Sequence, residues 1–278
     1  MAQDLYRNRD FIPDFDALMA EIAARSHEFA AGVTVQADVA YGREPRARMD
    51  ILLPPTLRNG APVHMFIHGG YWRSGNKADH HLVAVPVHAV GGVAVIVGYG
   101  LLPATRLGPV VAQIRRAAQH VLAIAPTLGA DPARFTVSGH SAGAHLASYL
   151  AAHGPKDPPA PEFPAVRAIL MVSGIYDLSD IPSSFLKDEA GMTAQEAKDW
   201  SPLTAAQRPG PSRTITRGAQ ETAPFHDQAR AFASLLDHNG QPCTLHEEPG
   251  LNHLSILLAL ADPTSRLGGD LAAMISGS

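Results

Sequence analysis

Residues 139–143 read Gly-His-Ser-Ala-Gly, and the serine between the two glycines could supply a nucleophile. The short strand-like run 134–138 precedes this motif, and a segment of strong helix formers, 144–152, follows it. A strand, a tight turn and a helix in this order present a serine hydroxyl at the end of a strand, and the flanking glycines permit the close backbone contacts of such a turn. Ser141 is therefore the candidate nucleophile. The alternative is a glycine-rich turn whose serine only caps the helix.

A second glycine-rich motif, His68-Gly-Gly-Tyr-Trp72, follows the apolar run 63–67. Acyl transfer passes through a tetrahedral intermediate, which needs backbone N–H groups aimed at the developing oxyanion. We expect Gly69 and Gly70 to form this oxyanion hole together with the N–H of Ala142, the residue after the nucleophile. A glycine turn between a strand and a helix is the alternative, but the two motifs in this order are more specific than either one.

A general base should follow the last strand of such a sheet, because the chain order of the triad is nucleophile, acid, histidine. Four histidines lie far enough downstream of Ser141: His226, His238, His246 and His253. The first two fall in a predicted helix and the third in a predicted strand. His253 falls in the loop after that strand and is the candidate base.

The acid should follow the preceding strand, which we place at 214–217. Glu221 is the first carboxylate after this strand. Its role would be to fix the tautomer of His253 and to stabilise the imidazolium. Asp227, on a predicted helix surface, and Asp177, at the end of an earlier strand, remain alternatives.

The elements that must position these residues are short apolar runs alternating with helical segments. Alternation of this kind predicts an α/β fold with a mostly parallel sheet of eight strands and helices on both faces. The expected strands are 33–41, 46–53, 63–67, 93–97, 135–138, 168–172, 214–217 and 244–247. The expected helices are 14–30, 77–90, 109–125, 142–153, 194–200, 224–238 and 254–260. We expect a single domain over 1–278, with an N-terminal helical segment at 1–32 and small lid or cap elements at about 178–203.

Several side chains near these motifs could line a substrate pocket. We expect Tyr71, Trp72, His140 and Trp200 there, with core and loop packing as the alternative for the two tryptophans. The lid-like segment could add Phe185, Leu186 and Met192. Asp79-His80-His81 could suggest a metal site, but adjacent histidines on a helix point about 100° apart. We interpret these three as polar residues at a helix start and predict no metal.

Composition excludes several other classes of function. The net charge of the 278 residues is −4 and no basic cluster stands out, so nucleic-acid binding is not expected. One cysteine, Cys243, excludes an internal disulfide. The polar N-terminus and the lack of an apolar run of about 18–20 residues argue against a signal peptide and a membrane span. We expect a cytoplasmic protein that acts on a small molecule without a metal or organic cofactor, and we leave a homodimer open.

Together, these motifs resemble the kynurenine formamidase (arylformamidase)-like branch of the α/β hydrolases, which borders the hormone-sensitive-lipase-like esterases. The resemblance is carried by 68–72, 139–143, Gly218-Ala-Gln-Glu-Thr222 and Asn252-His253. It implies the α/β-hydrolase fold from about residue 41 to near the C-terminus. It also implies an oxyanion hole at Gly69 and Gly70 and a triad that contains Ser141 and His253. The branch often has Asp at the acid position, where this chain has Glu221.

The leading hypothesis is a serine hydrolase that cleaves a small carboxylic ester or an activated amide through an acyl-enzyme. The branch includes esterases that act on other substrates, so kynurenine formamidase activity is one alternative. An acyltransferase shares the acyl-enzyme and is another. A non-catalytic binding module on the same fold is the alternative from a different class, although such chains typically lose the serine or histidine that this chain retains.

Overall fold

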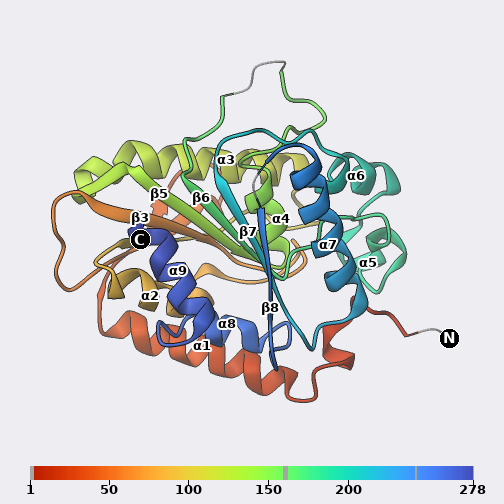
Figure 1. Ribbon diagram of the computed structural model, residues 1–278, viewed down its shortest axis with the longest axis horizontal. Helices are drawn as coiled ribbons and strands as arrows, with labels where there is room; N and C mark the ends of the chain where they lie inside the picture. Colours follow the sequence, from red (N-terminus) through yellow and green to blue (C-terminus); the bar gives the residue numbers. More distant parts are fainter. Residues whose placement is uncertain (1–2, 159–161, 242, 278) are drawn as a thin grey trace.

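An eight-stranded sheet forms the centre of the molecule, with the strand order β1-β2-β4-β3-β5-β6-β7-β8 (Figure 1). The computed structural model describes residues 3–158, 162–241 and 243–277. Strands β3 to β8 run parallel to one another, while β1 and β2 are antiparallel to their neighbours. The strands are β1 (Thr34–Ala40), β2 (Arg48–Leu53), β3 (Ala61–Ile67), β4 (Val93–Val97), β5 (Ala130–His140), β6 (Ala168–Val172), β7 (Ser212–Gly218) and β8 (Cys243–Glu248). The predicted α/β fold with a mostly parallel sheet is confirmed.

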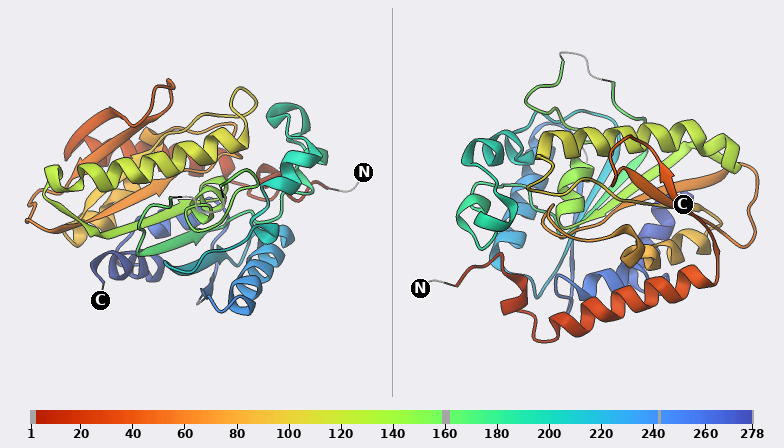
Figure 2. Two further views of the ribbon diagram at one scale, coloured as in Figure 1. Left: turned by 90° about the horizontal axis from the view of Figure 1, so that it is seen from above. Right: turned by 180° about the vertical axis from the view of Figure 1, so that it is seen from behind.

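Two hydrophobic cores cover the two faces of this sheet, because successive side chains of a strand point to opposite faces. In β3, Val63, Met65 and Ile67 enter one core and Phe66 enters the other. The first core packs against α3 (Leu107–Ile124), α4 and α7, and the second packs against α1, α2, α8 and α9. The left view of Figure 2 shows α3 and α9 on opposite sides of the sheet.

The remaining helices follow the predicted pattern with several differences, among them an α-helix at Lys187–Ala190 that the pattern does not predict. They are α1 (Phe15–Ala31), α2 (Ala84–Ala89), α4 (Ala142–Ser148), α5 (Lys187–Ala190), α6 (Ala194–Asp199), α7 (Ala223–His238), α8 (Ser255–Leu260) and α9 (Arg266–Ser276), with 3-10 helices η1 (Asn8–Asp10), η2 (Lys77–Val83), η3 (Ala125–Leu128), η4 (Ile181–Ser183) and η5 (Pro202–Thr204). The helix predicted over 77–90 is a 3-10 helix followed by a short α-helix. Helix α4 ends at Ser148, where the chain continues in tighter turns. Helix α9 was not predicted.

The segment predicted as lid-like, 178–203, contains η4, α5, α6 and η5. Its role as a lid stays a prediction. In the described part of the chain, no helix has both the length and the apolar character that crossing a membrane requires.

The parallel strands bring their carboxyl ends to one edge of the sheet, where ligands bind in open α/β sheets. The chain leaves β3 into the loop at His68, leaves β5 at Ser141, leaves β7 shortly before Glu221 and leaves β8 shortly before His253. The topology therefore gathers residues that are more than a hundred positions apart.

Candidate active site

Ser141 occupies a sharp turn between β5 and α4, with φ 55° and ψ −121°. This region is unfavourable for a residue with a side chain, so the surroundings must hold the turn in place. The Ser141 N–H donates to the carbonyl of Val172 at 2.8 Å. A Cβ atom at Gly139 would lie 2.3 Å from the carbonyl oxygen of Gly143, and one at Gly143 would lie 2.0 Å from that of Ile67. Both glycines are therefore required by the backbone contacts of the turn.

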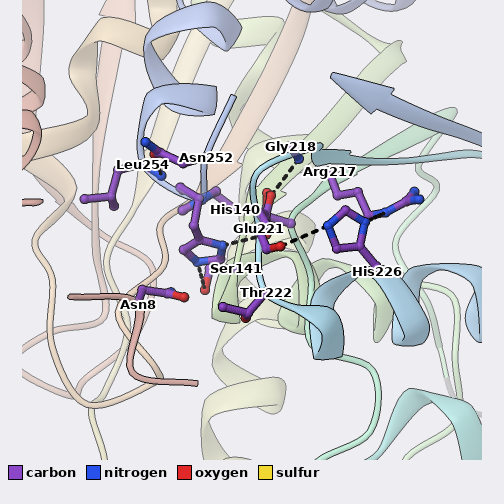
Figure 3. Close-up of polar contacts among 12 residues, drawn as sticks. Asn8, His140, Ser141, Arg217, Gly218, Glu221, Thr222, His226, Asn252 and Leu254 are labelled. Carbon is purple, nitrogen blue, oxygen red and sulfur yellow. Dashed lines mark hydrogen bonds and ion pairs between the residues drawn. The ribbon is translucent and has the colours of Figure 1, made fainter. Parts of the chain in front are cut away.

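A continuous chain of hydrogen bonds links Ser141, His253 and Glu221 (Figure 3). The Oγ atom of Ser141 lies 3.0 Å from Nε2 of His253, and Nδ1 of His253 lies 2.9 Å from Oε2 of Glu221. The carboxylate accepts a hydrogen bond from Nδ1–H, which keeps the imidazole proton on Nδ1 and leaves Nε2 free to accept the hydroxyl proton of the serine. The side chains of His253 and Glu221 are 5% and 0% exposed, so water does not compete for these contacts.

Two further donors hold the other oxygen of Glu221. Its Oε1 accepts hydrogen bonds from Ser173 Oγ at 2.5 Å and from the N–H of Gly218 at 2.7 Å. Ser173 follows β6 and also has a left-handed backbone, with φ 53°. The Glu221 carboxylate, on a side chain longer than that of aspartate, thus accepts from three donors: Ser173 Oγ, the N–H of Gly218 and Nδ1 of His253. These contacts keep Oε2 directed at His253.

The loop that carries His253 is fixed from both sides. The amide oxygen of Asn252 accepts from the N–H groups of Leu254 and Ser255, both at 2.9 Å. On the other side, Nε2 of His140 lies 2.8 Å from the carbonyl oxygen of His253 and donates to it. Burial, together with the nearby His253, holds the pKa of His140 well below its usual value. His140 is therefore neutral near pH 7, and its tautomer is set by this bond.

The loop after β3 contributes the glycines expected at an oxyanion hole. A Cβ atom at Gly69 would lie 3.0 Å from the Cβ of Ser141, so only glycine brings the backbone this close to Ser141. Gly70 has φ 111°, and a Cβ there would lie 2.3 Å from the carbonyl oxygen of Ser74. Ala142 is the first residue of α4, where backbone N–H groups have no partner within the helix.

A cavity of about 840 Å³ opens over these residues. Of the predicted site residues, it is lined by Gly69, Gly70, Tyr71, His140, Ser141 and His253. Apolar surface is added by Phe185 of the 178–203 segment and by Leu254 and Leu257, which follow His253. The cavity also has lining residues that the sequence did not suggest: Arg7, Asn8, Arg9, Asp10, Phe15 and Met19. The sequence carries no motif at these N-terminal positions that would indicate a site.

Trp72 and Trp200 do not line this cavity, which corrects the expectation. Trp72 is fully buried, and its indole N–H donates to Nδ1 of His145 at 3.0 Å. The Nε2 atom of His145 in turn lies 2.8 Å from the backbone carbonyl oxygen of Trp200, whose ring packs against Tyr149 at 5.2 Å. Trp72 therefore packs in the core, and the partly buried Trp200 packs against it.

Two more residues suggested for the pocket, Leu186 and Met192, are also buried in the core and do not line the cavity. Asp79, His80 and His81 lie in η2, close to its start, as expected. His81 is buried, and its Nε2 lies 2.8 Å from the carboxylate of Asp50. His80 is likewise buried, and its Nδ1 donates to the carbonyl of Asn76.

The rival acids and bases have other partners. Asp177 accepts from the N–H of Ser179 at 2.9 Å, as expected for a turn. Asp227 pairs with Arg230 on the surface of α7. His226 lies 2.8 Å from Nε of Arg217 and 3.0 Å from the carbonyl oxygen of Glu221.

Comparison with known proteins agrees with this geometry. The family model for the alpha/beta hydrolase fold matches residues 64–257. A kynurenine formamidase of Danio rerio is 30% identical over 271 residues, which cover 95% of this chain and 90% of the relative. Carboxylesterase NlhH of Mycobacterium tuberculosis is 29% identical and covers 80% of this chain and 75% of the relative.

Among solved structures, a protein of Silicibacter sp. TM1040 that is provisionally assigned as a thioesterase superposes with a TM-score of 0.79. It is 26% identical, and the match covers 98% of this chain and 97% of that one. The chain belongs to the α/β-hydrolase family, and within it to the hydrolases of esters and amides.

Proposed function

We propose that this hydrolase cleaves a small carboxylic ester through an acyl-enzyme, with Ser141 as nucleophile, His253 as general base and Glu221 as the residue that orients it. The observation that carries the proposal is the unbroken chain of contacts from Ser141 Oγ through His253 to Glu221, at 3.0 and 2.9 Å, on the wall of a cavity. His253 takes the proton of Ser141 as the hydroxyl attacks the carbonyl. It then returns this proton to the leaving group.

The oxyanion of the tetrahedral intermediate would be stabilised by backbone N–H groups at Gly69 or Gly70 and at Ala142. The close approach of Gly69 to Ser141 supports this assignment, because the donors must lie within hydrogen-bond distance of an oxygen attached to the carbon that Ser141 attacks. Water then attacks the acyl-enzyme, activated by His253 in the same way. Every step uses groups of this chain and a small-molecule substrate.

A formamidase is the second candidate function. It is supported by the Danio rerio relative named kynurenine formamidase, which matches nearly the whole chain. Ester and formamide hydrolysis share the nucleophile, the base and the oxyanion hole, and they differ in the leaving group that must be protonated. A substrate panel that pairs short p-nitrophenyl esters with N-formylkynurenine separates the two candidates.

The proposal is tested by Ser141→Ala. We expect kcat for p-nitrophenyl acetate to fall by about 10⁴-fold or more, because the nucleophile acts as one unit with its base. A fluorophosphonate probe should label the wild type and not the variant. Ser148→Ala is the matched control, since this serine lies on the same short helix and its hydroxyl only donates to the carbonyl of His145. Labelling of Ser141→Ala, or retention of most of its activity, would exclude the mechanism and favour a binding module.

A further inference from the structure

The N-terminal segment, residues 3–12, lies against the cavity beside the start of α7 (Figure 1). Three contacts clamp it in place. The hydroxyl of Thr222 donates to the carbonyl of Leu5 at 2.6 Å, and Nε2 of Gln228 donates to the hydroxyl of Tyr6 at 2.8 Å. The carboxylate of Asp4 accepts from the N–H of Phe185. The segment is therefore tied both to the residue after Glu221 and to the 178–203 segment.

Asn8 is the buried polar residue of this segment, with 7% of its surface exposed. Its amide orientation follows from its neighbours. The hydroxyl of Tyr71 donates its single proton to the carbonyl of Tyr6, and burial raises the pKa of Tyr71 well above its usual value, so the phenol stays protonated. The Tyr71 oxygen can then only accept, and it accepts from Nδ2 of Asn8 at 3.2 Å.

The side-chain oxygen of Asn8 is left as an acceptor. Among residues 3–158, 162–241 and 243–277, no group donates a hydrogen bond to Oδ1. Asn8 lines the same cavity as Ser141 and His253, and Figure 3 shows its side chain pointing toward Ser141. The arginines on either side are already engaged: Arg9 pairs with Asp16, and Arg7 lies over the ring of Phe185.

We propose that Asn8 is a substrate-binding residue whose Oδ1 accepts a hydrogen bond from an N–H or O–H group that the substrate carries close to its scissile carbonyl. The inference rests on the proposed function of Ser141 and His253. Oδ1 faces the cavity, where a bound substrate would cover it, so the site discriminates strongly against an isosteric substrate without the donor, because the acceptor then loses water and gains no partner. The substrate class is thus narrowed to acyl compounds with a donor next to the reacting bond.

The test uses isosteric ester pairs in which an N–H replaces a CH₂. On the acyl side, the pair is p-nitrophenyl N-acetylglycinate and p-nitrophenyl levulinate. On the leaving-group side, it is the acetate esters of N-acetylethanolamine and of acetopropyl alcohol. We expect kcat/KM of the wild type to favour the N–H member of at least one pair. Asn8→Ala should reduce that ratio about tenfold, the size of one hydrogen bond to a buried acceptor. The CH₂ member should change little.

The controls separate this inference from the proposed function. Asn59→Ala, at an exposed asparagine in a loop, should leave both ratios as in the wild type. Fluorophosphonate labelling of Asn8→Ala at the wild-type rate would show that Ser141 and His253 are intact. Equal ratios in the wild type and Asn8→Ala for both pairs would overturn the role of Asn8 while the proposed function stands. If Asn8→Ala does not fold, the wild type alone decides: equal kcat/KM values for the N–H and CH₂ members of both pairs would overturn the role of Asn8. A wild type that is neither labelled nor active on any of these esters would refute both.

Discussion

Replacing Glu221 with glutamine is a sharp test of the hydrogen-bond network, because the structure fixes which way the new amide must face. Three donors surround the carboxylate: Ser173 Oγ, the N–H of Gly218 and Nδ1–H of His253. The N–H of Gly218 can only donate, so the amide oxygen of Glu221→Gln must stay on that side. The NH₂ group then faces His253.

An NH₂ group that donates to Nδ1 forces the imidazole into the tautomer with its proton on Nε2. That nitrogen then donates to Ser141 Oγ and cannot take its proton. In serine proteases, the equivalent amide substitution lowers kcat about 10⁴-fold with little change in geometry. A loss of this size is about 5.5 kcal/mol in the activation barrier. We expect the same order here, since the side chain of Glu221 is fully buried and no water can replace the lost acceptor.

The assay is kcat for p-nitrophenyl acetate near pH 7, with thermal unfolding to confirm that Glu221→Gln is folded. Asp177→Asn is the matched control, because the Asp177 carboxylate accepts from the N–H of Ser179 and takes no part in the network. Its kcat should stay within about twofold of the wild type, as expected for a change outside the catalytic network. A folded Glu221→Gln that retains a tenth or more of wild-type kcat, or an equally large loss in Asp177→Asn, would refute the assignment of the acid.

Two further predictions concern stability. Burial lowers the pKa of His145 to about 4 and that of His64 to about 3, from 6.5, so unfolding below pH 6.5 takes up protons. The free energy of unfolding should therefore fall as the pH drops from 6.5 toward 4, by up to about 1.4 kcal/mol per pH unit for each histidine. In urea titrations at several pH values, His64→Gln should show a shallower dependence of this free energy on pH than the wild type. An unchanged dependence on pH would contradict this account. Gly143→Ala should destabilise by about 3 kcal/mol or more, since its Cβ would lie 2.0 Å from the carbonyl oxygen of Ile67. Gly32 has φ −96°, and a Cβ atom there would have no atom closer than 3.6 Å, so Gly32→Ala should leave the free energy of unfolding unchanged in the same urea titration. Equal effects of Gly143→Ala and Gly32→Ala would show that the close contact with Ile67 does not cause the destabilisation.

The sheet was predictable because its signals are local. Strands β3 and β4 appear in the sequence as short apolar runs, because their alternate side chains enter two different cores and both faces of the sheet are buried. The topology then constrains the site, since parallel strands end at one edge and residues that follow them must meet there. This is why Ser141, Glu221 and His253 could be selected by position after a strand, without knowledge of any distance.

Features that depend on tertiary contacts were not predictable in the same way. The helical pattern over 77–90 gives no sign that its first half is a 3-10 helix, in which His81 contacts Asp50 of β2. The sequence suits the two tryptophans equally to a pocket or to a core. In the structure, His145 accepts from the indole N–H of Trp72 and contacts the carbonyl of Trp200, and residues so far apart in the sequence give no local sign of this bridge.

The position of Asn8 beside the cavity could not be predicted from the order of the parallel strands. The topology predicts what lies at the carboxyl edge of the sheet, but the segment before β1 belongs to no strand, and its position depends on contacts such as Thr222 with Leu5 and Gln228 with Tyr6. The same contacts give this segment its chemistry, because the bond from Tyr71 to Tyr6 turns the amide nitrogen of Asn8 toward Tyr71 and leaves the oxygen as acceptor. The residues proposed for hydrolysis thus follow strands of the sheet. Selectivity would then come from the outlying segment, which can change without disturbing the strands that hold Ser141.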